Sequence, residues 1–508
     1  MSTRWAAAND VADDLNIHDA VSTRTQKAAA PLYASRIKVH PKDVSGRYRT
    51  VKWTILGLCL AVYYLAPWLR WERGAHAPDQ AILIDLPGRK AYFFFLEIWP
   101  QEVYFLTGLL VLAAIGLFLA TSLFGRIWCG YACPQTVWTD LFMLVERWIE
   151  GDRNARIRLD NAPASAGKLA KRAAKHAAWL LIALATGGAW ILYFGDAPTL
   201  VGEIFTGRAS MGDYFFIALF TATTYTLAGH AREQVCTYMC PWPRIQGAML
   251  DDQSYVVTYE DWRGEPRGKL AKAATGADPW VGRGDCVDCN ACVATCPTGI
   301  DIRDGQQLEC IGCGLCIDAC DAVMDKVGRP RGLIRFDTLD NQKLRAVGKP
   351  PAHKFVRPRT ILYAGVLAAV GGVMLGALLL RSTVELGVQR DRSPNFVRLT
   401  DGGIRNAYTV HVLNKTHETR DYTLAVEGLA GARISAVGEE RATASVALTA
   451  KPDAVASARV FVTLPAGSAA TRDSTPIEFV LRQVGGSDRT RRSAVFVAPL
   501  DDSARSRP

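Results

Sequence analysis

Eight of the 13 cysteines in this chain fall within one short stretch, in two copies of one pattern. "CVDCNACVATCPTGID" begins at Cys286, "CIGCGLCIDACDAVMD" begins at Cys310, and each reads C-x2-C-x2-C-x3-C. Three thiolates spaced two residues apart lie on a tight loop that can hold three corners of one [4Fe–4S] cube, whereas the fourth cysteine ligates the other cluster. We therefore predict two clusters. Their ligand sets are Cys286, Cys289, Cys292 and Cys320 for one, and Cys310, Cys313, Cys316 and Cys296 for the other.

A pair of zinc sites is the alternative to clusters, because two C-x2-C pairs can supply a tetrahedron of thiolates. That alternative leaves the third cysteine of each run awkwardly placed, so two complete tandem copies favour clusters. The bacterial pattern ends in proline after the fourth cysteine. Pro297 fits this pattern after Cys296, whereas Asp321 stands after Cys320, but this difference changes no cluster ligand. Short β and α pieces in a Gly- and Asp-rich setting predict a compact α+β, ferredoxin-like domain over residues 251–358.

Five uncharged, apolar runs stand between the charged stretches of the chain. A helix that crosses a bilayer core needs about 17–25 mostly apolar residues, and the runs reach or approach this length. We therefore predict a four-helix membrane domain over residues 53–250 and a fifth transmembrane helix over residues 359–381. The predicted spans are Trp53–Leu69, Val103–Gly125, Ala177–Gly195, Tyr214–Gly229 (extended to Met211–His230) and Thr360–Leu380.

Basic residues are concentrated on one side of these runs, whereas the loop Asp196–Asp213 carries only Arg208. No signal-peptide pattern precedes the first run, so we expect it to be an anchor. By the positive-inside rule, segment 1–52 and the cysteine-rich insert are expected in the cytoplasm, and residues after Arg381 in the periplasm, of a bacterial inner membrane. This orientation accounts for much of the net charge of +10, so we predict no nucleic-acid binding. The basic residues are Arg36, Lys38, Lys42, Arg47, Arg49 and Lys52 before the first span, and Arg147, Arg153, Arg156, Arg158, Lys168, Lys171, Arg172 and Lys175 before the third.

Two further cysteine pairs stand just after the second and fourth runs. "RIWCGYACPQT" contains Cys129 and Cys133, and "REQVCTYMCPWP" contains Cys236 and Cys240. Both read C-x3-C-P and lie 107 residues apart, which indicates an internal repeat. The i, i+4 spacing predicts two thiols on one face of a helix, with the proline ending or kinking that helix. We expect both pairs to face the cytoplasm and to offer four thiolates together.

Four thiolates leave several functions open. Soft thiolates select Cu(I), zinc or an iron–sulfur centre, and a dithiol can cycle to a disulfide while it passes electrons. Packing is the plain alternative, because free cysteine often fills buried space. Two pairs in a repeat beside an electron-carrying domain favour a function, so we expect these four cysteines to be catalytic. Cys59, which has no partner at ligand spacing, is expected to pack, and the roles of His230, His76 and Glu97 stay open.

After Arg381 the chain changes to short stretches of alternating apolar and polar residues with turn residues between them. Five such stretches, from "NAYTVHVLNK" to "RRSAVFVAP", are typical of an all-β sandwich of immunoglobulin type, which we predict over residues 390–508. This part contains no cysteine and no catalytic constellation, so we expect it to dock partners or to act as a spacer.

Taken together, the motifs resemble the cytochrome c oxidase accessory protein family CcoG, also called FixG or RdxA. The resemblance covers nearly the whole chain and rests on "WCGYACPQTVW", "REQVCTYMCPWPRIQGAML", "CVDCNACVATCPTGIDIR", "CIGCGLCIDACDAVMDKVGRPRGLIRFDT" and the immunoglobulin-like end. It implies a membrane-bound polyferredoxin that helps to mature the cbb3-type oxidase and reduces Cu(II) to Cu(I) before copper insertion. The implied partners are oxidase-assembly and copper-delivery proteins, and the implied essential cysteines are the eight cluster ligands and the four of the C-x3-C-P motifs.

Three hypotheses of function follow. In the first, an unidentified donor reduces the clusters and electrons pass to the four membrane-edge cysteines, where Cu(II) becomes Cu(I). In the second, the chain is a quinol-oxidising subunit that feeds a periplasmic reductase. In the third, the clusters are structural and the protein is a non-enzymatic copper chaperone or assembly scaffold. The sequence leaves open the oligomeric state, and whether the membrane-edge cysteines hold copper, a further cluster or a disulfide.

Overall fold

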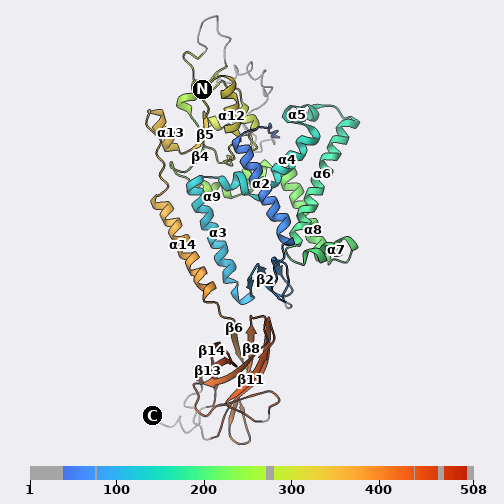
Figure 1. The fold of residues 1–508 in the computed structure, drawn as a ribbon, viewed down its shortest axis with the longest axis vertical. Helices are drawn as coiled ribbons and strands as arrows, with labels where there is room; N and C mark the ends of the chain where they lie inside the picture. The colour runs from blue at the N-terminus through green and yellow to red at the C-terminus, as the bar shows by residue number, and fades with distance from the viewer. Residues whose placement is uncertain (1–37, 75–76, 270–279, 440, 467–473, 500–508) are drawn as a thin grey trace. The chain divides into compact units, whose positions relative to one another are not determined.

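The computed structural model describes residues 38–74, 77–269, 280–439, 441–466 and 474–499. The chain forms two compact units, one from Met1–Arg70 with Gln80–Met374 and the other from Trp71–Asp79 with Leu375–Pro508. The first unit is mainly helical and carries the cysteine-rich insert, and the second holds a β-sandwich (Figure 1). The part of the predicted segment 1–52 that precedes residue 38 lies outside the described residues, as does His76.

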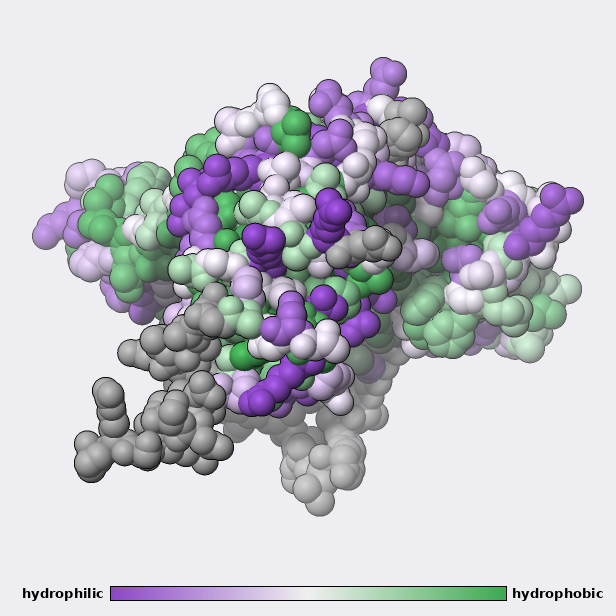
Figure 2. All heavy atoms as spheres, turned by 90° about the horizontal axis from the view of Figure 1, so that it is seen from below, coloured by the Kyte–Doolittle hydropathy of each residue, from purple (hydrophilic) through white to green (hydrophobic). Residues whose placement is uncertain are grey.

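Three helices in the described residues are long and apolar enough to cross a membrane. They match the first, second and fifth predicted spans and indicate a membrane protein. Their apolar side chains are largely exposed, as lipid-facing side chains must be, and Figure 2 shows hydrophobic side chains on the molecular surface beside hydrophilic ones. The three are Arg47–Trp68, which contains α2 (Arg47–Leu65), Pro100–Phe124, which contains α3 (Tyr104–Phe124), and α14 (Pro358–Leu379).

The third and fourth predicted spans also form helices, but these do not meet the same criteria of length and hydropathy. α6 (Ala166–Ile191) begins in a lysine-rich stretch and ends short of Gly195, where we expected its end. α8 (Met211–Thr224) has 14 residues and continues as a π-helix, Tyr225–Ala231. The number of five spans therefore stays a prediction.

α4 (Pro134–Glu150), α6 and α8 lie side by side around an apolar core (Figure 1). The rings of Phe142 and Trp179 are stacked with their centroids 5.4 Å apart, and the indole N–H of Trp179 donates a 3.0 Å hydrogen bond to the carbonyl of Phe142. This core fixes the segment that leads to the second cysteine pair. Three shorter helices complete this part, α5 (Arg153–Asn161), α7 (Ala197–Thr206) and α9 (Trp242–Met249).

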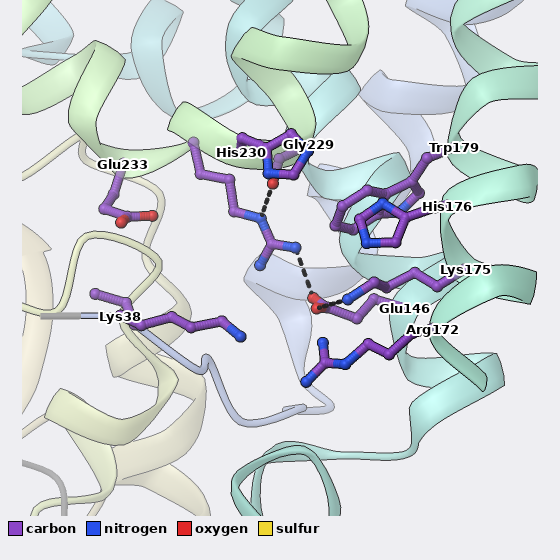
Figure 3. Close-up of a pocket in the computed structure, with 11 residues that line it drawn as sticks. Lys38, Glu146, Arg172, Lys175, His176, Trp179, Gly229, His230 and Glu233 are labelled. Atoms are coloured by element: carbon purple, nitrogen blue, oxygen red, sulfur yellow. Dashed lines mark hydrogen bonds and ion pairs between the residues drawn. The ribbon is translucent and has the colours of Figure 1, made fainter. Parts of the chain in front are cut away.

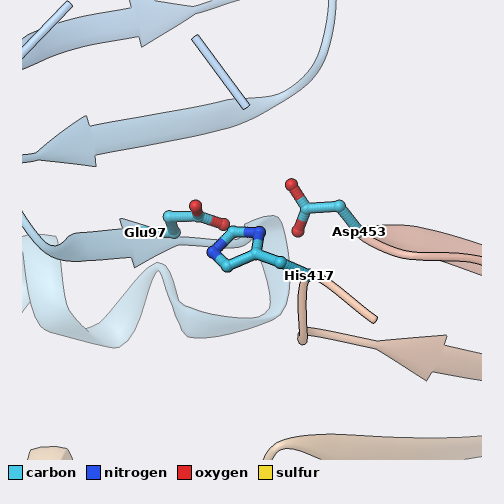
Figure 4. A group of neighbouring side chains, drawn as sticks. All are labelled: Glu97, His417 and Asp453. Atoms are coloured by element: carbon cyan, nitrogen blue, oxygen red, sulfur yellow. The ribbon is translucent and has the colours of Figure 1, made fainter. Parts of the chain in front are cut away.

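A small antiparallel sheet, which the sequence analysis did not predict, lies between α2 and α3 along the chain. It consists of β1 (Ile82–Asp85), β2 (Lys90–Phe93) and β3 (Leu96–Ile98) in that order. Glu97 lies on β3 and is buried (Figure 4). The residues just after β3 form a short turn in which the carboxylate of Glu102 accepts a hydrogen bond from the backbone N–H of Trp99.

The cysteine-rich insert is a small α+β module, as predicted. β4 (Val256–Tyr259) pairs with β5 (Ile334–Asp337) in an antiparallel ribbon, and the helices α11 (Ala291–Thr295) and α12 (Leu315–Lys326) pack on each other. α10 (Asp261–Gly264) and α13 (Leu339–Ala346) flank it. The module docks on the ends of the membrane helices, because the N–H of Arg49 donates to Asp318 at 2.8 Å and the N–H of Tyr255 donates to Leu123 at 3.0 Å.

The C-terminal unit is a two-sheet sandwich of the predicted all-β type. One sheet has the order β10-β12-β8-β6 with β7 on β8, and the other has the order β11-β9-β13-β14. Alternate residues of both sheets point inward and form a fully buried core. There the ring centroids of Tyr408 and Phe479 lie 5.0 Å apart. The strands are β6 (Val384–Arg390), β7 (Val397–Arg398), β8 (Ile404–Asn414), β9 (Arg420–Glu427), β10 (Arg433–Ala436), β11 (Ser445–Ala450), β12 (Ala454–Leu464), β13 (Ser474–Gln483) and β14 (Arg489–Val497).

The sandwich begins before residue 390, where we expected its start, because β6 pairs with β8 along its whole length. Four of its strands, β6, β7, β10 and β11, were not among the five stretches that the sequence analysis singled out. Two loops at one end of the sandwich carry His417 and Asp453 (Figure 4), and the N–H of Asp453 donates to the carbonyl of Thr416 at 3.0 Å.

Candidate iron–sulfur and thiol sites

The two C-x3-C-P motifs share one backbone conformation, which is not the α-helix that we predicted. Each forms a single π-helical turn, Trp128–Ala132 in the first motif and Val235–Met239 in the second. Each turn is closed by the N–H of its second cysteine, which donates to the carbonyl five residues back at 2.9 Å for Cys133 and 2.8 Å for Cys240. The second cysteine is extended, and the proline after it precedes or starts the next helix instead of kinking the first.

All four cysteines of these motifs line one cavity of about 290 Å³. Thr136 and Gln135 fix the first motif, since the Thr136 hydroxyl donates to the carbonyl of Cys129 and the Gln135 amide donates to the carbonyl of Leu227. The thiol of Cys129 donates to the amide oxygen of the fully buried Gln246 at 3.2 Å. The lining residues are Leu117, Arg126, Trp128, Cys129, Cys133, Gln135, Thr136, Val235, Cys236, Cys240, Trp242, Pro243, Leu308, Glu309 and Ile311.

One wall of this cavity belongs to the insert, at the loop that leads into Cys310. Cys129 and Cys236 pack against the apolar cluster of Ile311, Cys313 and Leu315. The structure therefore places the membrane-edge thiols directly against the ligand loop of the second cysteine run.

Close approach at this wall depends on Gly130, which lies between the two cysteines of the first motif. A Cβ atom at Gly130 would come within 2.9 Å of the carbonyl oxygen of Ile311 and within 3.0 Å of that of Gly312. Because both neighbours are backbone atoms, only glycine fits without a shift of the loop.

Arg126 ties the same loop to both cysteine motifs. Its guanidinium donates to the carbonyls of Leu308, of Cys310 at 3.1 Å and of Pro243 at 2.6 Å. Pro243 lies just after the second cysteine pair, so one buried side chain connects the insert with α9 and the end of α3. The sequence analysis did not single out Arg126, whose only sequence signal is a charge directly after an apolar run.

The insert brings the cysteines of its two runs together across the module. Cys296, from the first run, lines a cavity with Cys310, Cys313 and Cys316. We call these four the inner ligand set, because they lie beside the membrane-edge cysteines. The outer ligand set, Cys286, Cys289, Cys292 and Cys320, lies in an apolar cluster with α12, and Cys310 and Cys316 of the inner set also pack against this cluster.

The surroundings of these eight thiols fit iron–sulfur clusters. Backbone N–H groups point at the sulfurs, that of Gly312 at Cys310, that of Leu315 at Cys313 and that of Ala291 at Cys289. Hydrogen bonds to sulfur and solvent exclusion are the means by which a protein tunes a cluster. Burial raises the pKa of Cys310 to about 12, so the thiolate form needs the positive charge of iron to stabilise it.

A second cavity, of about 220 Å³, lies between α4, α6 and the segment before Cys236 (Figure 3). The imidazole rings of His176 and His230 stack there with centroids 5.7 Å apart, and the Tyr225 hydroxyl hydrogen-bonds His176 Nδ1 at 2.9 Å. Burial, Lys175 and His230 lower the pKa of His176, so its imidazole is neutral at pH 7. Trp179 meets both histidine rings edge-on.

The floor of this second cavity is a buried ionic network around Glu146. Its carboxylate lies 3.0 Å from Arg156, 2.9 Å from Arg232 and 3.7 Å from Lys175. Figure 3 shows Glu146 and Lys175 side by side. Burial opposes ionisation of Glu146, but these cations lower its pKa to about 2. Arg232 has a positive φ of 40° and lies four residues before Cys236, so the network fixes the entry to the second motif.

Protein-family models cover three parts of the chain. A model described as "4Fe-4S dicluster domain" matches residues 231–339, and one described as "4Fe-4S binding domain" matches residues 106–152. A model of the "IG-like fold at C-terminal of FixG" matches residues 374–499. The predicted 4Fe-4S dicluster domain and the predicted immunoglobulin-like fold are thereby confirmed, whereas the insertion of the dicluster domain between membrane spans stays a prediction.

Relatives with closely similar sequences extend over most of the chain. The "Nitrogen fixation protein FixG" of Rhizobium meliloti is 53% identical over 476 residues, which are 88% of this chain and 90% of the relative. "Protein RdxA" of Cereibacter sphaeroides is 50% identical over 472 residues, 92% of this chain and 98% of the relative. A crystal structure of a FixG-related protein from Vibrio parahaemolyticus is 24% identical and covers 23% of this chain and 99% of that chain, with a TM-score of 0.20.

Proposed function

Because this chain belongs to the FixG/RdxA family, with its iron–sulfur domains, we propose that it reduces Cu(II) to Cu(I) during the maturation of a cbb3-type oxidase. One observation carries the proposal: the inner ligand set shares a wall with the cavity of the four membrane-edge cysteines. An electron on the inner ligand set's cluster could pass directly to the cavity of the membrane-edge cysteines. The name of the relative FixG also links the family to nitrogen fixation.

The proposed path has three stages. The outer ligand set would hold a cluster that takes an electron from a donor, and the inner ligand set would hold a second cluster, from which the electron would reach Cu(II) at the membrane-edge cavity. Each [4Fe–4S] cluster carries one electron, and Cu(II) needs one electron to become Cu(I), so no further partner is required for balance.

The test is a double variant, Cys133→Ser with Cys240→Ser, in purified protein. We expect the rate of Cu(II) reduction to fall by at least about tenfold, while dithionite still reduces the clusters of the insert. Cys59→Ser is the matched control, because Cys59 lies in a membrane helix and outside both motifs. A double variant that reduces Cu(II) at the normal rate would refute the proposal.

A second candidate function is quinol oxidation, and the cavity of Figure 3 is the observation that favours it. Oxidation of a quinol releases two electrons and two protons, so the site needs proton acceptors. His176 and His230 are such acceptors, since imidazole binds a proton near neutral pH, and both line a cavity at the edge of the predicted membrane domain. The two electrons would reduce one cluster each.

This candidate is tested by anaerobic addition of a short-chain quinol to the oxidised protein without copper. We expect bleaching of the cluster absorbance, slowed in the variants His176→Ala and His230→Ala and unchanged in His411→Ala of the sandwich. If the wild-type clusters stay oxidised, the donor is not a quinol. Clusters that change oxidation state at no accessible potential in an EPR titration would instead support the structural-scaffold hypothesis.

A further inference from the structure

The four membrane-edge cysteines surround one cavity, but they do not approach one another as the ligands of one ion do. Four thiolates on a tetrahedral ion with metal–sulfur bonds of about 2.3 Å have their sulfurs about 3.8 Å apart. Among the described residues, which include all 13 cysteines, no three cysteine sulfurs lie within 4.8 Å of one another. The arrangement therefore does not fit a single copper or zinc ion held by three or four thiolates.

The eight cysteines of the insert offer a comparison within the same chain. They match a dicluster model, and their sulfurs also fail to gather within 4.8 Å in groups of three. In a cubane each thiolate binds a different iron, so the sulfurs stand at separate corners and stay farther apart than on one ion. By this measure the membrane-edge cysteines are no more tightly grouped than the eight cysteines of the insert.

The cavity between them has the size and lining that a cluster requires. Its volume of about 290 Å³ is several times the ~30 Å³ that one water occupies, so it exceeds the need of a bare ion. Apolar side chains such as Leu117, Trp242 and Ile311 form much of its wall. Gln246, which accepts from the thiol of Cys129, is fully buried there and can turn its amide N–H toward a sulfur.

The matched family models divide the cysteines in a way that supports a separate centre. The model described as "4Fe-4S binding domain" ends at residue 152, so it includes Cys129 and Cys133 and none of the eight insert cysteines. The dicluster match begins at residue 231 and includes the other pair, Cys236 and Cys240. Because all four cysteines line one cavity, each half of the repeat would contribute two ligands to one site.

We propose that Cys129, Cys133, Cys236 and Cys240 hold a third [4Fe–4S] cluster, one residue to each iron. The cluster itself follows from the geometry, whereas its place in the electron path rests on the proposed function. The inner cluster passes from the 1+ to the 2+ state and gives one electron to the third cluster, which passes from 2+ to 1+. The third cluster then gives that electron to Cu(II) outside the cage of thiolates, and no proton moves.

The experiment counts iron and acid-labile sulfide in protein that is purified without oxygen and reconstituted with iron and sulfide. We expect about 12 of each per chain in the wild type and about eight in Cys133→Ser/Cys240→Ser, four for each cluster. Cys59→Ser should keep about 12. The dithionite-reduced wild type should also give an EPR signal that the double variant lacks, and the eight irons left in that variant show that it has folded.

Two outcomes separate this inference from the proposed function. A wild type with about eight irons, and with one copper bound by the membrane-edge thiols, overturns the third cluster and leaves copper reduction standing. A wild type with about 12 irons that reduces no Cu(II) keeps the third cluster and overturns copper reduction. Eight irons without bound copper after reconstitution also overturn the third cluster.

Discussion

The hydroxyl of Tyr131 donates a 3.0 Å hydrogen bond to the main-chain carbonyl of Cys313. Tyr131 lies between the two cysteines of the first membrane-edge pair, and Cys313 belongs to the inner ligand set. One residue of the π-helical turn therefore holds the loop that carries the neighbouring cluster ligands. Movement of the insert away from the membrane helices would break this contact together with those of Arg126 and Gly130.

Gly130→Ala should loosen this docking. The new methyl group would press on two carbonyl groups of the ligand loop, and overpacking of this kind costs about 1–3 kcal/mol. We expect slower Cu(II) reduction with unchanged iron content, measured by stopped-flow absorbance after reduction of the clusters. Gly116→Ala is the control, because an added Cβ there meets nothing within 4 Å. Equal rates in the two variants would contradict the close approach at Gly130.

Arg126→Met should also weaken the contact between the insert and the membrane helices. It removes the donor to three partly buried carbonyl groups, and a fully buried unsatisfied group costs about 1–3 kcal/mol, which is the upper limit for each of them. We expect faster proteolysis of the insert in detergent, followed by the appearance of its fragments on gels. Arg208→Met, at an exposed position, should leave the proteolysis rate unchanged. The prediction is wrong if both variants are cut at the wild-type rate.

Glu146→Gln should destabilise the helical unit. The variant leaves Arg156, Lys175 and Arg232 without their shared carboxylate, and removal of one partner from a buried ion pair costs about 3–5 kcal/mol. We expect a lower midpoint of thermal unfolding in detergent. Glu427→Gln removes an exposed carboxylate of the sandwich, and its effect should stay within about 1 kcal/mol. Similar midpoints for both variants would argue against the buried network.

Stability should fall between pH 7 and pH 5 because of His40. Burial, Lys38 and Arg156 lower its pKa from 6.5 to about 4, although Asp160, 3.2 Å away, also pairs with Lys38 and favours the charged imidazole. Below pH 6.5 His40 therefore binds a proton in the unfolded chain but stays neutral in the folded chain. The free energy of unfolding then falls by up to about 1.4 kcal/mol for each pH unit. His40→Gln should flatten this part of the curve of unfolding midpoint against pH. A variant with the wild-type slope would show that other groups cause it.

The sequence predicted best where chemistry fixes the spacing. The spacing C-x2-C-x2-C-x3-C predicted the 4Fe-4S dicluster domain, and alternation along stretches such as Ala454–Leu464 predicted the sandwich. The assignment of single cysteines to each cluster stays a prediction. The π-helical turns were not predicted, because a spacing of four residues suits an α-helix as well. Arg126 was missed because its partners lie far away in the sequence, more than 180 residues for Cys310. Glu146 was missed because its cations, Arg156, Lys175 and Arg232, come from three different segments. β1–β3 were missed because strands of three or four residues leave little pattern.

The shared π-helical turn has a consequence for the origin of the chain. Both turns close on the same hydrogen bond, both end in an extended cysteine, and both are followed by proline. The four-thiol cavity is thus built from two equivalent half-sites, each with one π-helical turn and one cysteine pair. Duplication and fusion of a half-length ancestor would produce this arrangement, and two copies of such an ancestor would have formed the same site as a homodimer.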